Sequence, residues 1–392
     1  MLSDTFNPRN LKRFGLDFVR GKGHEVICLD VSDIVHPKVD RDRSDYSRLR
    51  STMEVIHVKD IDSLNGLVDM ASNSDLIMNF AESGILTKRH WPIMRFIAKT
   101  GVPYLVQFSN AYPGHKRYKD IGGILDRIRD FWRRISEFDP IDSCLSRLPR
   151  QILGIPAPSF VIYGGQCCEG YSRFVDGSTK RVFAHAMDYD EYRRVKSGTF
   201  KLANTAVFLD EFLPYHPDIT MMGLKAPMDA GPYFVALRGL FERIEKELGL
   251  AVVIAACPHS DYEERPGIFG GRRIEKYRTA DLVSESRLVI AHRSTAINYA
   301  VLFRKPLMLT ATRSTYRHSS QTPYFDGLSI ALQKSIQFFD DPAEINLCNP
   351  YEVDNAIYDR YIRDYIKKPN SPNMSYWEIV ADGINGSGIT KI

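Results

Sequence analysis

The sequence contains no apolar run of the roughly 18 to 20 residues that a membrane-spanning helix needs. Its first residues, MLSDTFNPRNLKRFG, also lack the apolar core of a secretory signal peptide. Together these absences exclude a membrane-embedded protein and predict a cytoplasmic one.

Cysteine pairs and metal-ligand clusters are missing as well. The six cysteines are scattered, without a Cys-x-x-Cys pair or a Cys/His grouping at zinc spacing. We therefore expect reduced thiols that mostly fill space in the core, and no metal site. The net charge of +4 is too small to indicate nucleic acid as a partner.

What is present is an ordinary globular composition in a long chain. Hydrophobic residues make up 44% and charged residues 26%, which argues against disorder. At 392 residues the chain exceeds what one hydrophobic core usually supports, so two domains are expected.

Apolar segments alternate with helical ones along the first 200 residues. Strands are expected at 24–31, 75–80, 102–109, 159–165 and 181–187, with helices at 87–100 and 121–135. This alternation predicts a parallel sheet covered on both faces, a Rossmann-like domain over 1–200. A helical stretch at 10–20 precedes the first strand, whereas such domains open with a strand, so we expect a shortened N-terminus.

A second alternating series follows. Its expected strands are 205–212, 251–257, 287–292 and 306–312, and its expected helices are 232–248, 279–285 and 296–303. The series predicts a second Rossmann-like domain over 201–340, and a helical tail over 341–392 that packs back across the domains. In such doubly wound α/β sheets ligands bind beyond the carboxyl ends of the strands, so the candidate site residues are sought there.

The segment LVIAHRSTAINYAVLFRKPLMLT is the most informative of these strand ends. Ser294 and Thr295 can begin the next helix, where free N–H groups attract an anion, but a serine also caps helices that bind nothing. His292 and Arg293 stand directly before them. This combination at one strand end favours a phosphate site.

A family resemblance rests on this region. The run GIFGGRRIEKYRTADLVSESRLVIAHRSTAINYAVLFRKPLMLT, with VFLDEFLPYHPD upstream, resembles bacterial surface-carbohydrate biosynthesis proteins of capsule and O-antigen function. The resemblance extends over most of the chain, from RFGLDFVRGKGHEVICLDVSDIVHP onward. It implies a GT-B glycosyltransferase, in which two Rossmann-like domains face a cleft and the C-terminal one holds the nucleotide sugar.

A weaker resemblance is to sialyltransferase-like transferases of Kdo and nonulosonic acids, which use CMP-activated donors. Those enzymes direct a His-Pro pair and a later Ser/Thr pair at the donor phosphate, and Ser294 and Thr295 match the second pair. At the first pair Cys257 stands before Pro258 where histidine is expected. His259 either supplies the imidazole or is a solvated loop residue.

Other charged residues complete the expected donor side. Acidic residues after the first strand of the second domain can bind a ribose or acceptor, or cap the loop. Arginines at 272 and 273 can neutralise a phosphate, or form a solvated loop before a helix cap at Thr279. The expected donor-binding residues are Asp210, Glu211, Pro258, His259, Arg272, Arg273, Thr279, His292, Arg293, Ser294 and Thr295.

An inverting transfer also needs a base that removes the acceptor hydroxyl proton. The resemblance places it in the first domain, where Glu82, Asp188 and Asp190 follow apolar strands. Each of these can instead be a capping or hinge residue. The expected acceptor-side residues are Gln107, Ser109, Asn110 and His185.

The basic stretch 114–140 mixes apolar and cationic residues. It either rests on an anionic membrane surface, where lipid-linked glycans are found, or packs on its own sheet.

The sequence as a whole predicts a metal-independent glycosyltransferase without a cofactor. It transfers a sugar from a nucleotide-sugar donor, with CMP-nonulosonate or CMP-Kdo favoured, to a bacterial surface polysaccharide or lipid-linked glycan. The lack of an obvious DxD-like metal site is consistent with this, because a GT-B enzyme can stabilise the leaving phosphate with N–H groups and cations. The alternatives are a sugar-nucleotide epimerase of the same fold and a catalytically degenerate glycan- or nucleotide-binding protein.

Overall fold

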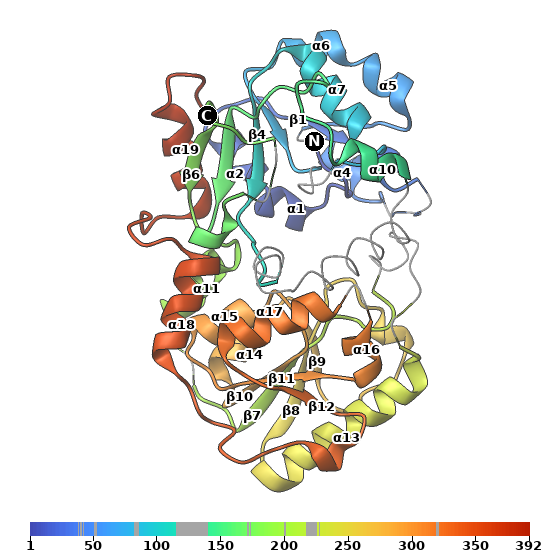
Figure 1. Cartoon of the computed structure of the whole chain (residues 1–392), viewed down its shortest axis with the longest axis vertical. Helices are drawn as coiled ribbons and strands as arrows, with labels where there is room; N and C mark the ends of the chain where they lie inside the picture. The colour runs from blue at the N-terminus through green and yellow to red at the C-terminus, as the bar shows by residue number, and fades with distance from the viewer. Residues whose placement is uncertain are drawn as a thin grey trace. The chain divides into compact units, whose positions relative to one another are not determined.

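The computed structural model describes the chain except residues 38, 40, 42, 51–52, 82–85, 115–139, 171, 173, 200, 217–225, 227 and 319–320, and the side chain of residue 143. The chain divides into two compact units (Figure 1). Unit 1 comprises Met1–Ser109, Gly122–Met187 and Lys367–Ile392, and unit 2 comprises Asn110–Ile121 and Asp188–Ile366. The last segment of the chain therefore belongs to the first unit.

Unit 2 is built on a six-stranded parallel sheet of order β12-β11-β10-β7-β8-β9. Its strands are β7 (Thr205–Leu209), β8 (Ala251–Ala256), β9 (Ile274–Lys276), β10 (Leu288–Ala291), β11 (Leu307–Ala311) and β12 (Ile336–Phe338). In chain order this is the doubly wound Rossmann arrangement 3-2-1-4-5-6. The strand order reverses between β7 and β10, which are hydrogen-bonded neighbours.

The core of unit 2 lies between this sheet and α13 (Ala230–Leu248). Apolar residues of α13 recur every three or four positions, so one face of the helix is buried. Leu237, Phe241 and Ile244 of that face belong to the same cluster as Phe208 and Ile290 of the sheet. The helix ends where Gly249 adopts a left-handed conformation (φ 64°) that favours glycine.

The other helical elements among the described residues of unit 2 are short. They are α11 (Asp188–Lys196), η2 (Tyr262–Glu264), α14 (Thr279–Glu285), α15 (Ile297–Leu302), α16 (Arg313–Arg317), α17 (Thr322–Leu332), η3 (Pro342–Glu344), α18 (Asn355–Tyr361) and η4 (Ile362–Ile366).

Unit 1 contains two parallel sheets. One has the order β3-β4-β5-β6, and the other pairs β1 with β2. The strands are β1 (Ile27–Asp30), β2 (Glu54–His57), β3 (Ile77–Asn79), β4 (Tyr104–Phe108), β5 (Phe160–Tyr163) and β6 (Lys180–Phe183). The first two residues bridge the sheets, because Leu2 N donates to Leu29 O at 3.1 Å and Phe80 N donates to Met1 O at 3.0 Å.

Helices cover the sheets of unit 1. They are α1 (Pro8–Arg13), α2 (Leu16–Gly21), α3 (Ser32–Val35), α4 (Tyr46–Leu49), α5 (Ile61–Asn65), α6 (Val68–Ser72), α7 (Trp91–Thr100), α10 (Pro140–Leu145), η1 (Gln166–Cys168) and α19 (Tyr376–Asn385). The single helix expected over 10–20 is wrong, because Gly15, with φ 69°, separates α1 from α2. A Cβ on Gly15 would collide with the Trp377 ring of α19.

The C-terminal helix α19 completes the core of unit 1. Tyr376, Trp377 and Val380 pack in one cluster with Phe160 of β5 and Val182 of β6. Across the described ranges, no helix is both long and apolar enough to cross a membrane.

Candidate functional site

The carboxyl ends of β7 and β10 are joined by a carboxylate where the strand order reverses. Glu211 follows β7, and its Oε1 accepts the backbone N–H of Arg293 at 2.6 Å. Its Oε2 lies 3.7 Å from Arg293 Nε. Burial raises the pKa of Glu211, against the opposing effect of the Arg293 charge. A ligand of a doubly wound sheet binds at this kind of reversal.

Arg293 offers a cation at this point. Its guanidinium lies 5.7 Å from the centre of the Tyr324 ring, and its carbonyl accepts the Tyr112 hydroxyl at 2.6 Å. The side chain is 28% exposed, and Nε makes no hydrogen bond to any described residue. Arg293 is thus held in place with its Nε enclosed, and the exposed part of its side chain presents a positive charge to an anion.

Ser294 and Thr295 form an open turn after β10. Ser294 Oγ accepts the N–H of Ala296 at 3.2 Å, and Ala296 is the N-cap of α15, so the expected side-chain cap is not formed. The N–H groups of Ser294 and Thr295 donate to nothing within the described ranges, and Thr295 is exposed. Since α15 has only six residues, the features here that can attract an anion are these N–H groups and Arg293 rather than a helix dipole.

His292 points into the core instead. Its Nε2 pairs with the Tyr233 hydroxyl at 2.9 Å, and its Nδ1 pairs with the Thr310 carbonyl at 2.8 Å. The ring stacks on Phe339, and burial lowers the pKa of His292 to about 4. A neutral, enclosed imidazole joins β10, β11 and α13 and does not offer a charge to a phosphate.

Asp210 ties β7 to the loop after β8. One carboxylate oxygen accepts Phe212 N (3.0 Å) and the Tyr262 hydroxyl (2.9 Å), and the other accepts Cys257 N (3.1 Å). Burial raises the pKa of Asp210 to about 6, although these hydrogen bonds oppose it. Asp210 therefore holds the loop after β8 in place next to the end of β7.

The loop after β8 is a tight turn. Ser260 N donates to the Cys257 carbonyl at 3.0 Å, with Pro258 and an exposed His259 at the corner. The Ser260 hydroxyl is buried and has no partner among the described residues. His259 can therefore reach a ligand, whereas Cys257 is a packed strand-end residue.

An exposed tyrosine follows β9 at the same edge of the sheet. Tyr277 is 68% exposed and has a positive φ of 62°, uncommon for a bulky residue. Lys276 beside it is held by the Ser260 carbonyl and by Glu263, and Thr279 is the half-buried first residue of α14. An open aromatic ring at a strand end can stack on a nucleobase. Sequence reasoning missed Tyr277, because Arg272 and Arg273 in the same segment were the more evident candidates for binding the donor.

Those arginines lie at the opposite, amino end of β9. Arg272 is held by both oxygens of Glu245, at 2.8 and 2.6 Å, and lies over the Phe241 ring. Arg273 pairs with Glu275 at 3.1 Å. The structure does not bring these two donor-side candidates together with Arg293.

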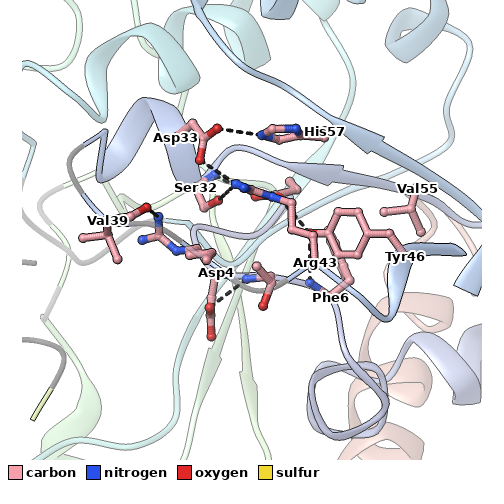
Figure 2. A network of polar contacts seen from close by, with 12 residues as sticks. Asp4, Phe6, Ser32, Asp33, Val39, Arg43, Tyr46, Val55 and His57 are labelled. Carbon is pink, nitrogen blue, oxygen red and sulfur yellow. Dashed lines mark hydrogen bonds and ion pairs between the residues drawn. The ribbon is translucent and has the colours of Figure 1, made fainter. Parts of the chain in front are cut away.

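A network of charges surrounds His57 at the carboxyl ends of β1 and β2 in unit 1 (Figure 2). His57 Nε2 lies 2.7 Å from Asp33 Oδ2, and Arg43 pairs with the other oxygen of Asp33. Arg43 Nε also contacts Asp30 at 2.9 Å, and Asp30 accepts the Tyr46 hydroxyl at 2.7 Å. Burial would raise the pKa of Asp33, but hydrogen bonds from Arg43 and His57 outweigh it and lower that pKa.

This arrangement suits proton transfer. An ionised Asp33 accepts a hydrogen bond from Nε2 and orients the imidazole, leaving Nδ1 of a 21% exposed side chain as the nitrogen that can accept a proton. The sequence analysis missed the pair, because Asp33 and His57 lie 24 positions apart and meet only when β1 pairs with β2. The available signal was a histidine ending the strand EVIH.

The expected acceptor-side residues of unit 1 lie together, but inside the fold. Gln107 Nε2 donates to the Tyr376 hydroxyl at 2.7 Å, and that hydroxyl contacts Ser109 Oγ at 3.1 Å. His185 is fully buried, packs edge-on against Tyr376, and contacts the Met374 carbonyl at 3.3 Å. These contacts join β4 and β6 to the C-terminal segment.

Comparison with solved structures addresses the fold. The chain is similar to Arabidopsis thaliana UGT89C1, with a TM-score of 0.51, 10% identity, and coverage of 96% of this chain and 95% of that one. It is also similar to the glycotransferase of kitacinnamycin, with a TM-score of 0.50, 12% identity and 92% of each chain covered. The fold is of the GT-B type. At these identities the likeness shows the fold alone.

Sequence comparison adds no relative. No model of a known protein family matches the chain, and no curated protein matches it. The resemblance to capsule and O-antigen proteins, and the CMP-sugar branch within it, therefore stay proposals.

The remaining base candidates lie elsewhere in this GT-B fold. Asp188 begins α11, and its Oδ2 accepts Asn298 Nδ2 at 3.0 Å, while Asp190 pairs with Arg193 at 3.7 Å. Asn110 is exposed. Glu82 lies outside the described residues, as does most of the basic stretch 114–140.

A cavity of about 500 Å³ opens beside the ends of β11 and β12, next to the start of α13. Its polar lining residues are Asp229, Tyr233, Thr312, Ser314 and Asp340. Hydroxyls and carboxylates of this kind suit a polyol. Among the described residues, no group of three or more His, Cys, Asp or Glu side chains could hold a metal ion.

Proposed function

We propose that the chain is a glycosyltransferase that binds a nucleotide sugar at the carboxyl edge of the unit 2 sheet. The observation that carries this is the open turn at Ser294 and Thr295 beside the Arg293 guanidinium, at the reversal of strand order. Free N–H groups with an adjacent cation stabilise a phosphate and the charge that develops on it as it leaves.

The donor is proposed to lie along the edge from β9 to β12. Tyr277 and Thr295 are separated by three strand spacings, roughly 14 Å, which is comparable with the reach of an extended nucleotide sugar. The base stacks on Tyr277, the phosphate contacts Arg293 and the 294–295 turn, and the sugar extends to the cavity lined by Asp229 and Asp340.

The finer assignment is a CMP-activated nonulosonate or Kdo donor and a bacterial surface polysaccharide, or a lipid-linked precursor of one, as acceptor. It rests on the resemblance at Ser294 and Thr295, and on His259, which is exposed next to Pro258 and able to contact the donor phosphate. This assignment depends on the His-Pro motif, in which Cys257 stands in place of the expected histidine.

Within unit 1, we propose the His57–Asp33 pair as the candidate general base. A base in this class of reaction removes the acceptor hydroxyl proton as the oxygen attacks the anomeric carbon and the donor phosphate leaves with the bonding electron pair. No metal is required, because the Arg293 guanidinium and the turn stabilise the leaving group. Glu82 remains a candidate, whereas Asp188 is engaged by Asn298.

The test is a thermal-shift screen of the whole chain against CMP, CDP, UDP, GDP and dTDP. Ligand binding to the folded state at a hundred times its Kd stabilises it by about 2.7 kcal/mol. A rise in Tm with CMP alone supports the CMP-sugar branch, and a response to UDP alone refutes that branch. If none of the five nucleotides raises the Tm, the proposed donor site is wrong.

Product analysis then identifies the reaction. A transferase releases nucleotide in proportion to acceptor glycosylated, whereas an epimerase converts the nucleotide sugar without any acceptor. If the chain binds a nucleotide but yields neither a glycosylated acceptor nor an epimerised nucleotide sugar, it is a nucleotide-binding protein, and the proposed catalysis is refuted.

A further inference from the structure

One face of unit 1 exposes large apolar side chains on three neighbouring segments. Trp91 at the start of α7 is 39% exposed, Ile141 in α10 is 56% exposed, and Ile152 in the loop before β5 is 71% exposed. Exposure of this degree is unusual for residues of this size when it recurs within one small area.

Two hydrogen bonds bring these segments together. The backbone N–H of Lys88 donates to Asp142 Oδ1 at 2.6 Å, which places α10 beside the start of α7, as Figure 1 also shows. Arg95 donates to the Leu153 carbonyl at 3.4 Å, which places the loop carrying Ile152 beside the second turn of α7. We call this surface the α7–α10 face, defined by Lys88, Trp91, Arg95, Ile141, Arg147 and Ile152.

Positive charge dominates the α7–α10 face. Residues 86–100 and 140–155 contain one acidic residue, Asp142. The same two segments contain six basic residues: Lys88, Arg89, Arg95, Lys99, Arg147 and Arg150. Lys88, Arg95, Lys99 and Arg147 are exposed, so the charge reaches solvent.

This combination distinguishes between two kinds of partner. The buried centre of a protein interface is depleted in charged residues, whereas here the segments that carry the apolar side chains also carry six basic residues. A bilayer accepts both, because apolar side chains and tryptophan enter the headgroup region while Lys and Arg pair with lipid phosphates.

We propose that the α7–α10 face docks unit 1 on an anionic lipid bilayer. Trp91, Ile141 and Ile152 enter the headgroup region, and Lys88, Arg95 and Arg147 contact the anionic lipids. The proposal does not depend on the proposed glycosyl transfer, since it concerns a surface made only of described residues of unit 1.

The test measures co-sedimentation of the full chain with vesicles of phosphatidylcholine containing 30% phosphatidylglycerol, and with pure phosphatidylcholine, at low salt. We expect binding to the anionic vesicles only, weakened when 0.5 M NaCl screens the charges. The double variant Ile141→Asp/Ile152→Asp and the double variant Lys88→Glu/Arg147→Glu should each lower vesicle affinity tenfold or more.

Val235→Asp/Ile330→Asp is the matched control, because both residues are at least half exposed but lie in unit 2. Unchanged circular dichroism and Tm establish that each variant is folded. Absence of binding to anionic vesicles overturns the proposal, as does equal loss in the control and the two face variants. Self-association in solution that Ile152→Asp abolishes, without vesicle binding, would instead make the face an interface between copies of the chain.

Discussion

The Asp210→Asn substitution tests the role of the most enclosed carboxylate of the candidate site. Asp210 has a pKa of about 6 in the folded chain, against 3.8 for an ordinary aspartate, because burial disfavours its charge. The folded state therefore binds the proton more tightly than the unfolded state. The contribution of Asp210 to the free energy of unfolding is fully present below pH 3.8. It is lost as the pH rises through 6, and the loss amounts to about 3 kcal/mol by pH 7.

Asparagine removes that pH dependence and introduces a different cost. Its amide keeps one oxygen for Phe212 N and the Tyr262 hydroxyl but presents an NH₂ group to Cys257 N, so one buried donor loses its acceptor. That loss costs about 1 to 3 kcal/mol at every pH. We expect the variant to be less stable than the parent protein at pH 4.5 and close to it at pH 7.

Hydrogen exchange of peptides covering β7 and β8 measures this locally, since it reports the opening free energy of the strands that Asp210 joins. Asp190→Asn serves as the control, because Asp190 lies outside this network and is 37% exposed. If the parent protein and Asp210→Asn lose protection in parallel from pH 4.5 to 7, Asp210 does not titrate as burial requires, and the reasoning is refuted.

Arg293→Met keeps a flexible stem over Tyr324 but removes the charge, so nucleotide affinity measured by calorimetry should fall about 10- to 100-fold. Tyr277→Ala should weaken nucleotide binding by about 5- to 100-fold, the range of base stacking, and Tyr277→Phe should restore it; unchanged affinity in Tyr277→Ala would remove the base from this position. His57→Ala should lower kcat about 10²- to 10⁴-fold with nucleotide affinity retained. Asp33→Asn should lower kcat less and alter the pH profile of kcat, and full activity in both variants would assign the base to another residue.

The sequence predicted the fold better than the site. Nine expected strands have counterparts in β1, β3 to β8, β10 and β11, and all of these except β6, whose first two residues are exposed, are mostly buried. The strands β2, β9 and β12 lie at the edges of their sheets and are only three or four residues long, and so their partly exposed residues give no clear apolar run.

Site residues were harder to predict, because a strand end fixes where a side chain starts but not where it points. His292 and Arg293 are consecutive, yet the first is enclosed by Tyr233 and Thr310 while the second lies at the strand reversal. Asp33 and His57 could be paired only once the parallel register of β1 and β2 was known.

The packing of α19 has a consequence for synthesis of the chain. Strands β5 and β6 leave the ribosome some 200 residues before Tyr376 and Trp377, the side chains that cover them. At roughly 5 to 20 residues per second, their apolar face waits on the order of ten seconds or longer for its cover. Unit 2 lies almost wholly within one continuous segment and can close during that interval. The first unit to be translated is thus the last to be completed, and during that interval its uncovered sheet is a natural substrate for chaperones.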